Sequence, residues 1–149
     1  MIILDTNVIS ELMRPEPDHN VLAWSRSHAG RELCTTAITV AEIHYGIERL
    51  PATRRKTVLM AAARDVFAAF DWQVLSFDRA AALNYATLVA ERDRTGRPIN
   101  GFDAQIAAIC RSRQATLATR NVPDFQSTGV SLLDPWQDLQ KPPASERPR

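Results

Sequence analysis

The sequence predicts an α/β fold in which a central parallel sheet is covered by helices on both faces. Short apolar runs alternate with longer segments of helical periodicity, which is the pattern of a doubly covered parallel sheet. The first run, residues 1–4, is apolar at every position, as expected for a strand that is buried on both faces. Folds of this class bind ligands at the carboxyl ends of their strands.

The chain has 149 residues, of which 45% are hydrophobic, so it is long enough for one domain with a substantial core. We expect this single domain to span residues 1–136. From Lys141 onward the chain is rich in proline, serine and charge, and we therefore expect residues 137–149 to form a disordered tail.

The first part of the chain predicts a strand, two helices and a second strand. After the strand at residues 1–4, the segment Asp5-Thr6-Asn7 begins a helix. Pro15 and Pro17 end that helix and open another. The apolar and β-branched residues 33–36 are the second predicted strand.

The middle of the chain predicts a helical hairpin followed by a strand. Helical periodicity runs from residue 37 to about residue 50, and Pro51 separates this helix from a longer one that reaches about residue 70. Residues 72–77 are a predicted strand, and Asp78 caps the helix that follows.

The last part predicts one more helix and two strands. Gly96 and Pro98 end the helix capped by Asp78, and Asn100 caps another at about residues 101–112. The remaining predicted strands are two apolar runs, residues 115–119 and 130–133.

Charge and cysteine content narrow the functional classes. The net charge is only +1, so the whole chain carries no strong nucleic-acid signal. Two basic clusters can face a phosphate backbone, but we favour solvated helix faces for both, Arg54-Arg55-Lys56 and Arg92 with Arg94 and Arg97. Cys34 and Cys110 match no zinc or redox spacing and are expected in the core.

No apolar run reaches the roughly 20 residues of a membrane span, and no signal peptide is recognisable at the start. We therefore expect a soluble, cytoplasmic protein without a membrane partner.

Three acids, Asp5, Glu42 and Asp103, each interrupt an apolar stretch. A carboxylate in such surroundings is costly unless a partner or a metal compensates its charge. Each acid also has a structural explanation. Asp5 can be a helix N-cap, and Asp103 can be stabilised by the dipole of the helix that Asn100 caps. Glu42 is harder to explain in this way, because no basic residue lies three or four positions from it.

The three acids together suggest a metal site. Two carboxylates about 5 Å apart repel by roughly 3 kcal/mol at an effective dielectric near 20, so convergence of all three requires compensation. Oxygen ligands suit Mg²⁺ or Mn²⁺ better than zinc, and such an ion can activate water and stabilise the charge on a phosphodiester.

Four further residues are secondary candidates for this site. Asn121 can orient water or a ligand, and Asp124 can add a fourth acid. Asn121 can equally be an ordinary turn residue, and Asp124 can be a helix cap. Thr6 and Asn7 can reach the same pocket or serve only as caps. No phosphate-cradling glycine loop and no pair of nearby histidines is present in the sequence, which disfavours nucleotide-triphosphate hydrolysis and metal-free imidazole catalysis.

Four segments in order resemble the PIN-domain ribonucleases, and more closely the VapC-type toxins of type II toxin–antitoxin pairs, including the FitB-like subgroup. The resemblance extends from Met1 to about Trp136. The segments that carry it are Ile3 to Glu11, Thr39 to Ile47, Asn100 to Ala107, and Thr119 to Phe125.

This resemblance implies a three-layer α/β/α sandwich and hydrolysis of RNA that depends on Mg²⁺ or Mn²⁺. Asp5, Glu42 and Asp103 match the three main acidic positions of the family. A fourth acid is common where this chain has Asn121, so the chain departs there or recruits Asp124, and one or two metal ions remain possible.

The same resemblance implies a homodimer and a small VapB-like antitoxin whose end occupies the groove, in an assembly that can be larger than the dimer. Two alternatives stay open at this point. The protein can be a metal nuclease that acts on DNA, or a non-catalytic protein that uses the same fold to bind a nucleotide or a partner.

Overall fold

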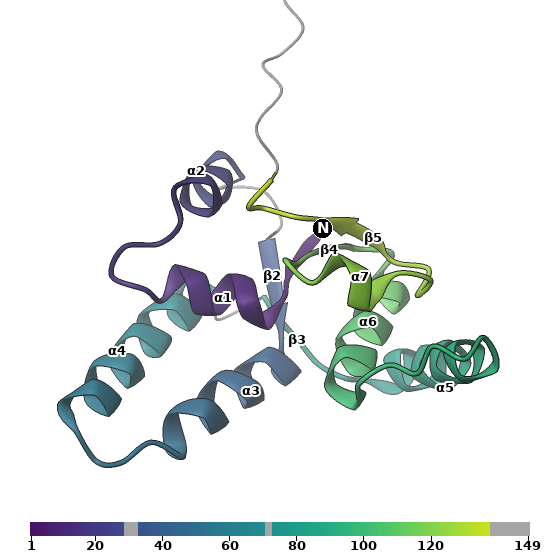
Figure 1. The fold of residues 1–149 in the computed structure, drawn as a ribbon, viewed down its shortest axis with the longest axis horizontal. Helices are drawn as coiled ribbons and strands as arrows, with labels where there is room; N and C mark the ends of the chain where they lie inside the picture. Colours follow the sequence, from purple (N-terminus) through teal and green to yellow (C-terminus); the bar gives the residue numbers. More distant parts are fainter. Residues whose placement is uncertain (29–32, 71–72, 138–149) are drawn as a thin grey trace, which may run out of the picture.

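The structure is a computed structural model that describes residues 1–28, 33–70 and 73–137. Five parallel strands form one sheet in the order β3-β2-β1-β4-β5 (Figure 1). The strands are β1 (Ile2–Leu4), β2 (Leu33–Thr36), β3 (Val74–Leu75), β4 (Thr116–Ala118) and β5 (Ser131–Leu133).

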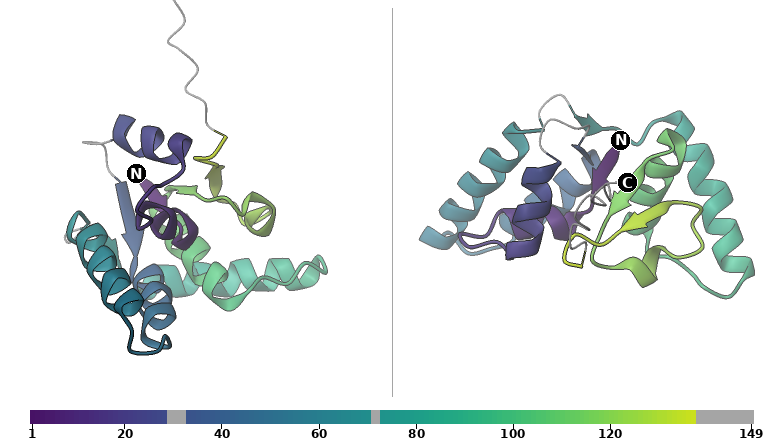
Figure 2. Two further views of the ribbon diagram at one scale, coloured as in Figure 1. Left: turned by 60° about the vertical axis from the view of Figure 1, so that its left-hand side comes forward. Right: turned by 90° about the horizontal axis from the view of Figure 1, so that it is seen from above.

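Helices cover both faces of this sheet, as the sequence predicts (Figures 1 and 2). Alternate strand residues face opposite sides, so Ile3 and Leu117 pack toward α5 and α6, whereas Leu4 and Ala118 pack toward the helices α1 to α4. The helices are α1 (Thr6–Leu12), α2 (His19–Ser27), α3 (Ala37–Glu48), α4 (Arg54–Ala68), α5 (Arg79–Arg94), α6 (Gly101–Arg113) and the short α7 (Val122–Phe125).

The order of the strands creates a switch point between β1 and β4. From the central β1 the chain adds β2 and β3 on one side, and then returns to place β4 on the other side of β1. Leu4 is aligned with Ala118, so Asp5 and Thr119 leave the sheet side by side at its carboxyl edge. A switch point at this edge is where open α/β sheets bind their ligands.

The predicted helix caps are confirmed. The carboxylate of Asp78 accepts a hydrogen bond from the backbone N–H of Ala81 at 2.9 Å, and the amide oxygen of Asn100 accepts one from Phe102 at 2.9 Å. The strand predicted over residues 72–77 is shorter, because only Val74–Leu75 pairs with β2, and Trp72 lies outside the described residues.

The prediction that Arg92 lies on a solvated helix face is wrong. Its side chain is buried and donates hydrogen bonds to three backbone carbonyl oxygens, those of Arg97, Asp124 and Gln126. These carbonyls belong to the loop after α5 and to the segment around α7, and their lone pairs compensate the buried guanidinium. Arg94 and Arg97 are exposed, as predicted.

Both cysteines are buried, as predicted, and burial raises the pKa of the Cys110 thiol well above its usual range. Within the described residues, the structure contains no helix that is long and apolar enough to span a membrane. The tail predicted over residues 137–149 lies outside the described residues, apart from Gln137.

Candidate functional site

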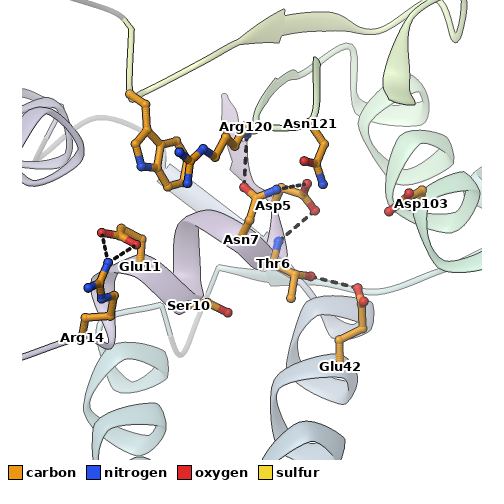
Figure 3. Close-up of a pocket in the computed structure, with 11 residues that line it drawn as sticks. Asp5, Thr6, Asn7, Ser10, Glu11, Arg14, Glu42, Asp103, Arg120 and Asn121 are labelled. Carbon is orange, nitrogen blue, oxygen red and sulfur yellow. Dashed lines mark hydrogen bonds and ion pairs between the residues drawn. The ribbon is translucent and has the colours of Figure 1, made fainter. Parts of the chain in front are cut away.

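A cleft of about 640 Å³ opens at the carboxyl edge of the sheet, beside the switch point (Figure 3). It brings together Asp5, Glu42 and Asp103, which come from the end of β1, from α3 and from the first turn of α6. The other residues that line it are Thr6, Asn7, Ser10, Glu11, Arg14, Arg120, Asn121 and Trp136.

Asp5 is almost fully buried and is held by three hydrogen bonds. One oxygen, Oδ1, accepts from the backbone N–H of Thr6 at 2.8 Å, which makes Asp5 the N-cap of α1. The other oxygen, Oδ2, accepts from the hydroxyl of Thr119 at 2.7 Å and from the amide of Asn7 at 3.1 Å. A carboxylate has about four acceptor positions, so one position of Asp5 is left for a further ligand.

Glu42 extends from α3 toward α1. The hydroxyl of Thr6 lies 2.9 Å from Oε1 of Glu42 and 3.1 Å from the hydroxyl of Thr39. A hydroxyl has a single proton, so Thr6 satisfies both contacts by donating to the carboxylate and accepting from Thr39. Within the described chain, the other carboxylate oxygen of Glu42 has no hydrogen-bond donor or ion-pair partner.

Asp103 lies in the first turn of α6, directly after the Asn100 cap. Its carboxylate is half-buried, and no described residue donates a hydrogen bond to it or forms an ion pair with it. The helix N-terminus stabilises this negative charge only in part. Asp103 therefore stands in the cleft with its acceptor positions free.

Burial raises the pKa of all three acids, and the negative charge of a neighbouring acid adds to the rise in each case. Burial is the largest cause for each of them, and for Asp103 the charges of Asp5, Glu42 and Asp124 add to it and raise its pKa to about 6. The charge of Asp5 also raises the pKa of Glu42, although the hydrogen bond from Thr6 opposes this rise. The cluster thus holds more negative charge than its surroundings neutralise.

The ligand atoms fit a hard divalent cation. All the free acceptors are oxygens, and Mg²⁺ is commonly held by one or two carboxylates while it keeps several waters. Among the described residues, no three His, Cys, Asp or Glu side chains stand close enough to surround an ion directly. Asp5, Asp103 and Glu42 each keep a free acceptor position, so each could contact an ion directly or through a water that the ion keeps.

Comparison with known proteins identifies the family of this chain. The family model of the PIN domain matches residues 2–129. The chain is 39% identical to "VapC ribonuclease Y4jK" of Sinorhizobium fredii over 92% of this chain and 99% of that protein. It is 36% identical to "Toxin FitB" of Neisseria gonorrhoeae over 93% of this chain and all of that protein. The chain belongs to the PIN-domain family.

A solved structure extends the PIN-domain match to three dimensions. The crystal structure of FitAcB from Neisseria gonorrhoeae superposes with a TM-score of 0.84 at 36% identity, covering 92% of this chain and 99% of that chain. The α/β/α arrangement expected from the sequence is therefore the PIN fold.

Three of the four secondary candidates line the cleft, and one does not. Thr6, Asn7 and Asn121 line the cleft, whereas Asp124 is exposed and does not line it. The alternative role of Asp124 as a helix cap is also wrong, because Asn121 precedes α7 and Asp124 lies inside it. Asp124 nevertheless adds to the negative potential, since its charge raises the pKa of both Asp5 and Asp103.

Sequence reasoning missed several cleft residues. Thr119 donates the shortest hydrogen bond to Asp5, and the alignment of β1 with β4 was the signal that could have found it. Ser10, Glu11 and Arg120 also line the cleft; they lie in segments that carry the PIN resemblance but were not singled out as site residues. Arg14 and Trp136 lie outside those segments.

Proposed function

We propose that this PIN domain is the toxin of a type II toxin–antitoxin pair and acts as a metal-dependent endoribonuclease that hydrolyses phosphodiester bonds of RNA. The observation that carries the proposal is the convergence of Asp5, Glu42 and Asp103 in one cleft, where burial and then the charges of neighbouring acids raise the pKa of Asp103 to about 6. The ribonuclease and toxin names of the relatives support the same class of reaction.

Mg²⁺ or Mn²⁺ would be held by Asp5 and Asp103, with Glu42 as a further ligand, directly or through water. When bound, such an ion supplies the positive charge that neutralises the acids and stabilises the charge developing on the phosphodiester. Asp5 orients its remaining acceptor position through its hydrogen bonds to Thr6, Asn7 and Thr119.

Glu42 and Asn121 have different tasks in this proposal. The oxygen of Glu42 that Thr6 does not contact is free to accept a proton from the attacking water, and the raised pKa of Glu42 suits this role. Asn121 carries no charge and lies on the rim of the cleft, where its amide can orient the water or a phosphate oxygen. Asp124 contributes through its charge rather than as a ligand.

A cleavage assay with matched substrates tests the reaction. We expect single-stranded RNA to be cut internally in the presence of Mg²⁺ or Mn²⁺, DNA of the same sequence to stay intact, and a chelator to stop cleavage. Equal cleavage of both strands would favour a DNA-cleaving or unspecific nuclease. An absence of cleavage with both ions would favour a non-catalytic binding protein.

The surface of α3 and α4 supports the second half of the proposal, a small antitoxin. An apolar hollow of about 770 Å³ lies between these helices, lined by Val40, His44, Met60, Arg64, Phe67, Ala68 and Val74. A second groove, lined in part by Ile43, Ile47 and Leu59, reaches Thr6 and Glu42 and so joins the α3–α4 surface to the cleft. A peptide lying there can bury apolar side chains and extend a basic one toward the acids.

Co-expression tests this partner. Expression of the protein alone should stop cell growth, because its RNA substrate lies in the cytoplasm. Co-expression of the product of an adjacent small reading frame should restore growth, and that product should co-purify with the protein. Light scattering on the purified protein should give the mass of a homodimer, and on the complex a larger one. A protein that is harmless when expressed alone and binds no adjacent product is not a toxin.

A further inference from the structure

The cleft has two ends of different chemistry. Asp103 and Glu42 lie at one end of Figure 3 and Arg14 with Glu11 at the other, with Asp5 between them. Arg120 and Trp136 also line the cleft. None of the ion pairs found among the described residues joins Arg14 or Arg120 to Asp5, Glu42 or Asp103. The three acids therefore hold neither arginine, and the one ion pair that Arg14 forms is with Glu11.

Arg120 and Trp136 form a stacked pair. The guanidinium carbon of Arg120 lies 5.1 Å from the centre of a Trp136 ring. Trp136 is fixed on both sides of its backbone, because its N–H donates to Asp134 at 2.9 Å and its carbonyl accepts from the amide of Asn20 at 2.9 Å. Its ring also packs against the core on the α1–α4 side of the sheet.

The backbone of Arg120 is hydrogen-bonded to a residue at the carboxyl edge of the sheet. Its N–H donates to the side-chain oxygen of Asn7 at 3.2 Å, and the amide of Asn7 donates to Asp5. The residue is exposed and lines the cleft, so solvent and ligands can reach its side chain. A planar cation on an aromatic ring presents a surface on which a nucleobase stacks.

Arg14 is an exposed cation beside a nearly buried anion. Its side chain is 64% exposed and lies 3.2 Å from Glu11, whose carboxylate is nearly buried. Glu11 also accepts a hydrogen bond from the backbone N–H of Asp18 at 2.7 Å, so it keeps a partner when Arg14 turns away. Arg14 lines both the cleft and the groove that leads from it toward α3 and α4.

A polyanionic substrate needs cations beside this acid cluster. A bound ion can neutralise the acids at the reacting phosphate, but the neighbouring phosphates of the same strand would still meet uncompensated negative charge. Arg14 and Arg120 line the same cleft as the acids, and the Arg120–Trp136 stack offers an unpaired base a planar partner.

We propose that Arg120 stacked on Trp136 binds a nucleobase of single-stranded RNA next to the cleaved bond, and that Arg14 binds the adjoining phosphate. This subsite rests on the proposed ribonuclease function and specifies how its substrate is held. It favours an unpaired strand, because a base within a duplex has no free face to stack.

Binding measurements separate the two contacts. The probe is a fluorescein-labelled, single-stranded RNA of twelve nucleotides with random sequence, added to the Asp5→Asn protein in Mg²⁺ so that the strand stays intact. Arg120→Ala and Trp136→Ala should each weaken binding about tenfold, the scale of one stacked base. The double variant should lose little more than the larger single loss, because both residues form one stack.

Salt dependence identifies the phosphate contact. Arg14→Gln should lower the slope of log K against log salt by about 0.7, the value for one phosphate of a single strand, whereas Trp136→Phe should leave the slope and most of the affinity unchanged. Arg94→Gln, which removes an exposed arginine of α5 outside the cleft, is the matched control and should change neither. Thermal unfolding checks that each variant is folded.

The outcomes distinguish the subsite from the proposed function. If the wild-type protein cleaves RNA while Arg120→Ala and Arg14→Gln bind and cleave like it, the subsite is wrong and the ribonuclease stands. If the same variants lose antitoxin affinity but keep RNA affinity, the surface binds protein and the subsite is also wrong. Failure of the wild-type protein to cleave overturns the proposed function, and failure to bind the RNA probe overturns the subsite.

Discussion

Asp5 and Asp103 are both carboxylates at the start of a helix, yet their surroundings differ. Asp5 is 3% exposed and receives hydrogen bonds from Thr6, Asn7 and Thr119. Asp103 is half-buried and receives no hydrogen bond from the described residues, although it lies in the first turn of α6, at the positive end of the helix dipole. The fold thus fixes one acid by direct contacts and leaves the other uncompensated.

This difference indicates that only one of the two acids also stabilises the fold. Asp5 stabilises the folded chain because it caps α1 and joins β1 to β4, so it has a structural role in addition to any catalytic one. Asp103 has no comparable structural partner, and its charge is repelled by the other acids. Both are proposed ligands, but only Asp5 is also part of the framework.

The largest expected effect separates these roles. Asp5→Asn and Asp103→Asn should each lower RNA cleavage by about a hundredfold or more, the scale of a lost electrostatic group at a reacting centre. Asp5→Asn should also cost about 1 to 3 kcal/mol of stability, because an amide cannot accept from Thr6, Asn7 and Thr119 at once. Asp103→Asn should leave the metal-free stability unchanged or higher. Urea unfolding beside a cleavage assay measures both, and equal destabilisation would show that the two acids have the same role.

Metal binding should stabilise the wild-type protein by a similar amount. At a hundred times its dissociation constant, an ion that binds only the folded state adds about 2.7 kcal/mol. This is a rise in Tm of about 5 to 10 °C for a domain of this size. Asp5→Asn and Asp103→Asn should both reduce the rise, and calorimetry with Mg²⁺ or Mn²⁺ measures it. An undiminished rise in either variant would remove that acid from the ligand set.

Thr119→Val should weaken the framework around Asp5 by about 2 kcal/mol, because it removes a buried hydroxyl that donates to a charged acceptor. It should also raise the pKa of Asp5 further, since that hydrogen bond lowers it. Thr119→Ser keeps the hydroxyl and is the matched control. Similar denaturation midpoints for the valine and serine variants would show that packing, rather than the hydrogen bond, decides the effect.

The smallest expected effect is a pH dependence of the metal-free protein. Burial and the neighbouring acids raise the pKa of Asp103 from 3.8 to about 6, so between these values the folded chain keeps a proton that the unfolded chain has released. Stability should therefore fall as pH rises through this window. Asp103→Asn should flatten the fall without removing it, because burial also raises the pKa of Asp5 and Glu42. A slope that is unchanged in Asp103→Asn would contradict this assignment.

The sheet and the helix caps could largely be predicted from the sequence, whereas the residues of the cleft could be predicted only in part. Alternating apolar runs predicted the covered parallel sheet, and Asp78 and Asn100 were found as caps because capping depends on local sequence. Arg92 was misplaced because its partners are carbonyls up to 34 residues away, which no local pattern indicates.

The cleft shows the same limit. The three acids were found because charge within an apolar run is visible in one dimension, whereas Arg14, Arg120 and Trp136 occupy ordinary surface positions in the sequence. Their shared place in the cleft depends on how β1, β4 and the segment after β5 come together. A single sequence without the sheet order does not contain that information.

The strand order also has a consequence for synthesis of the protein. Asp5 obtains its hydrogen bond from Thr119 across 114 residues, and β4 enters the sheet beside β1 only after β2 and β3 have been made. A nascent chain that ends before Thr116 therefore has Asp5 without its partner strand and lacks Arg120 and Trp136. Such a fragment cannot assemble the cleft, so the complete cleft forms only after nearly the whole domain has been made.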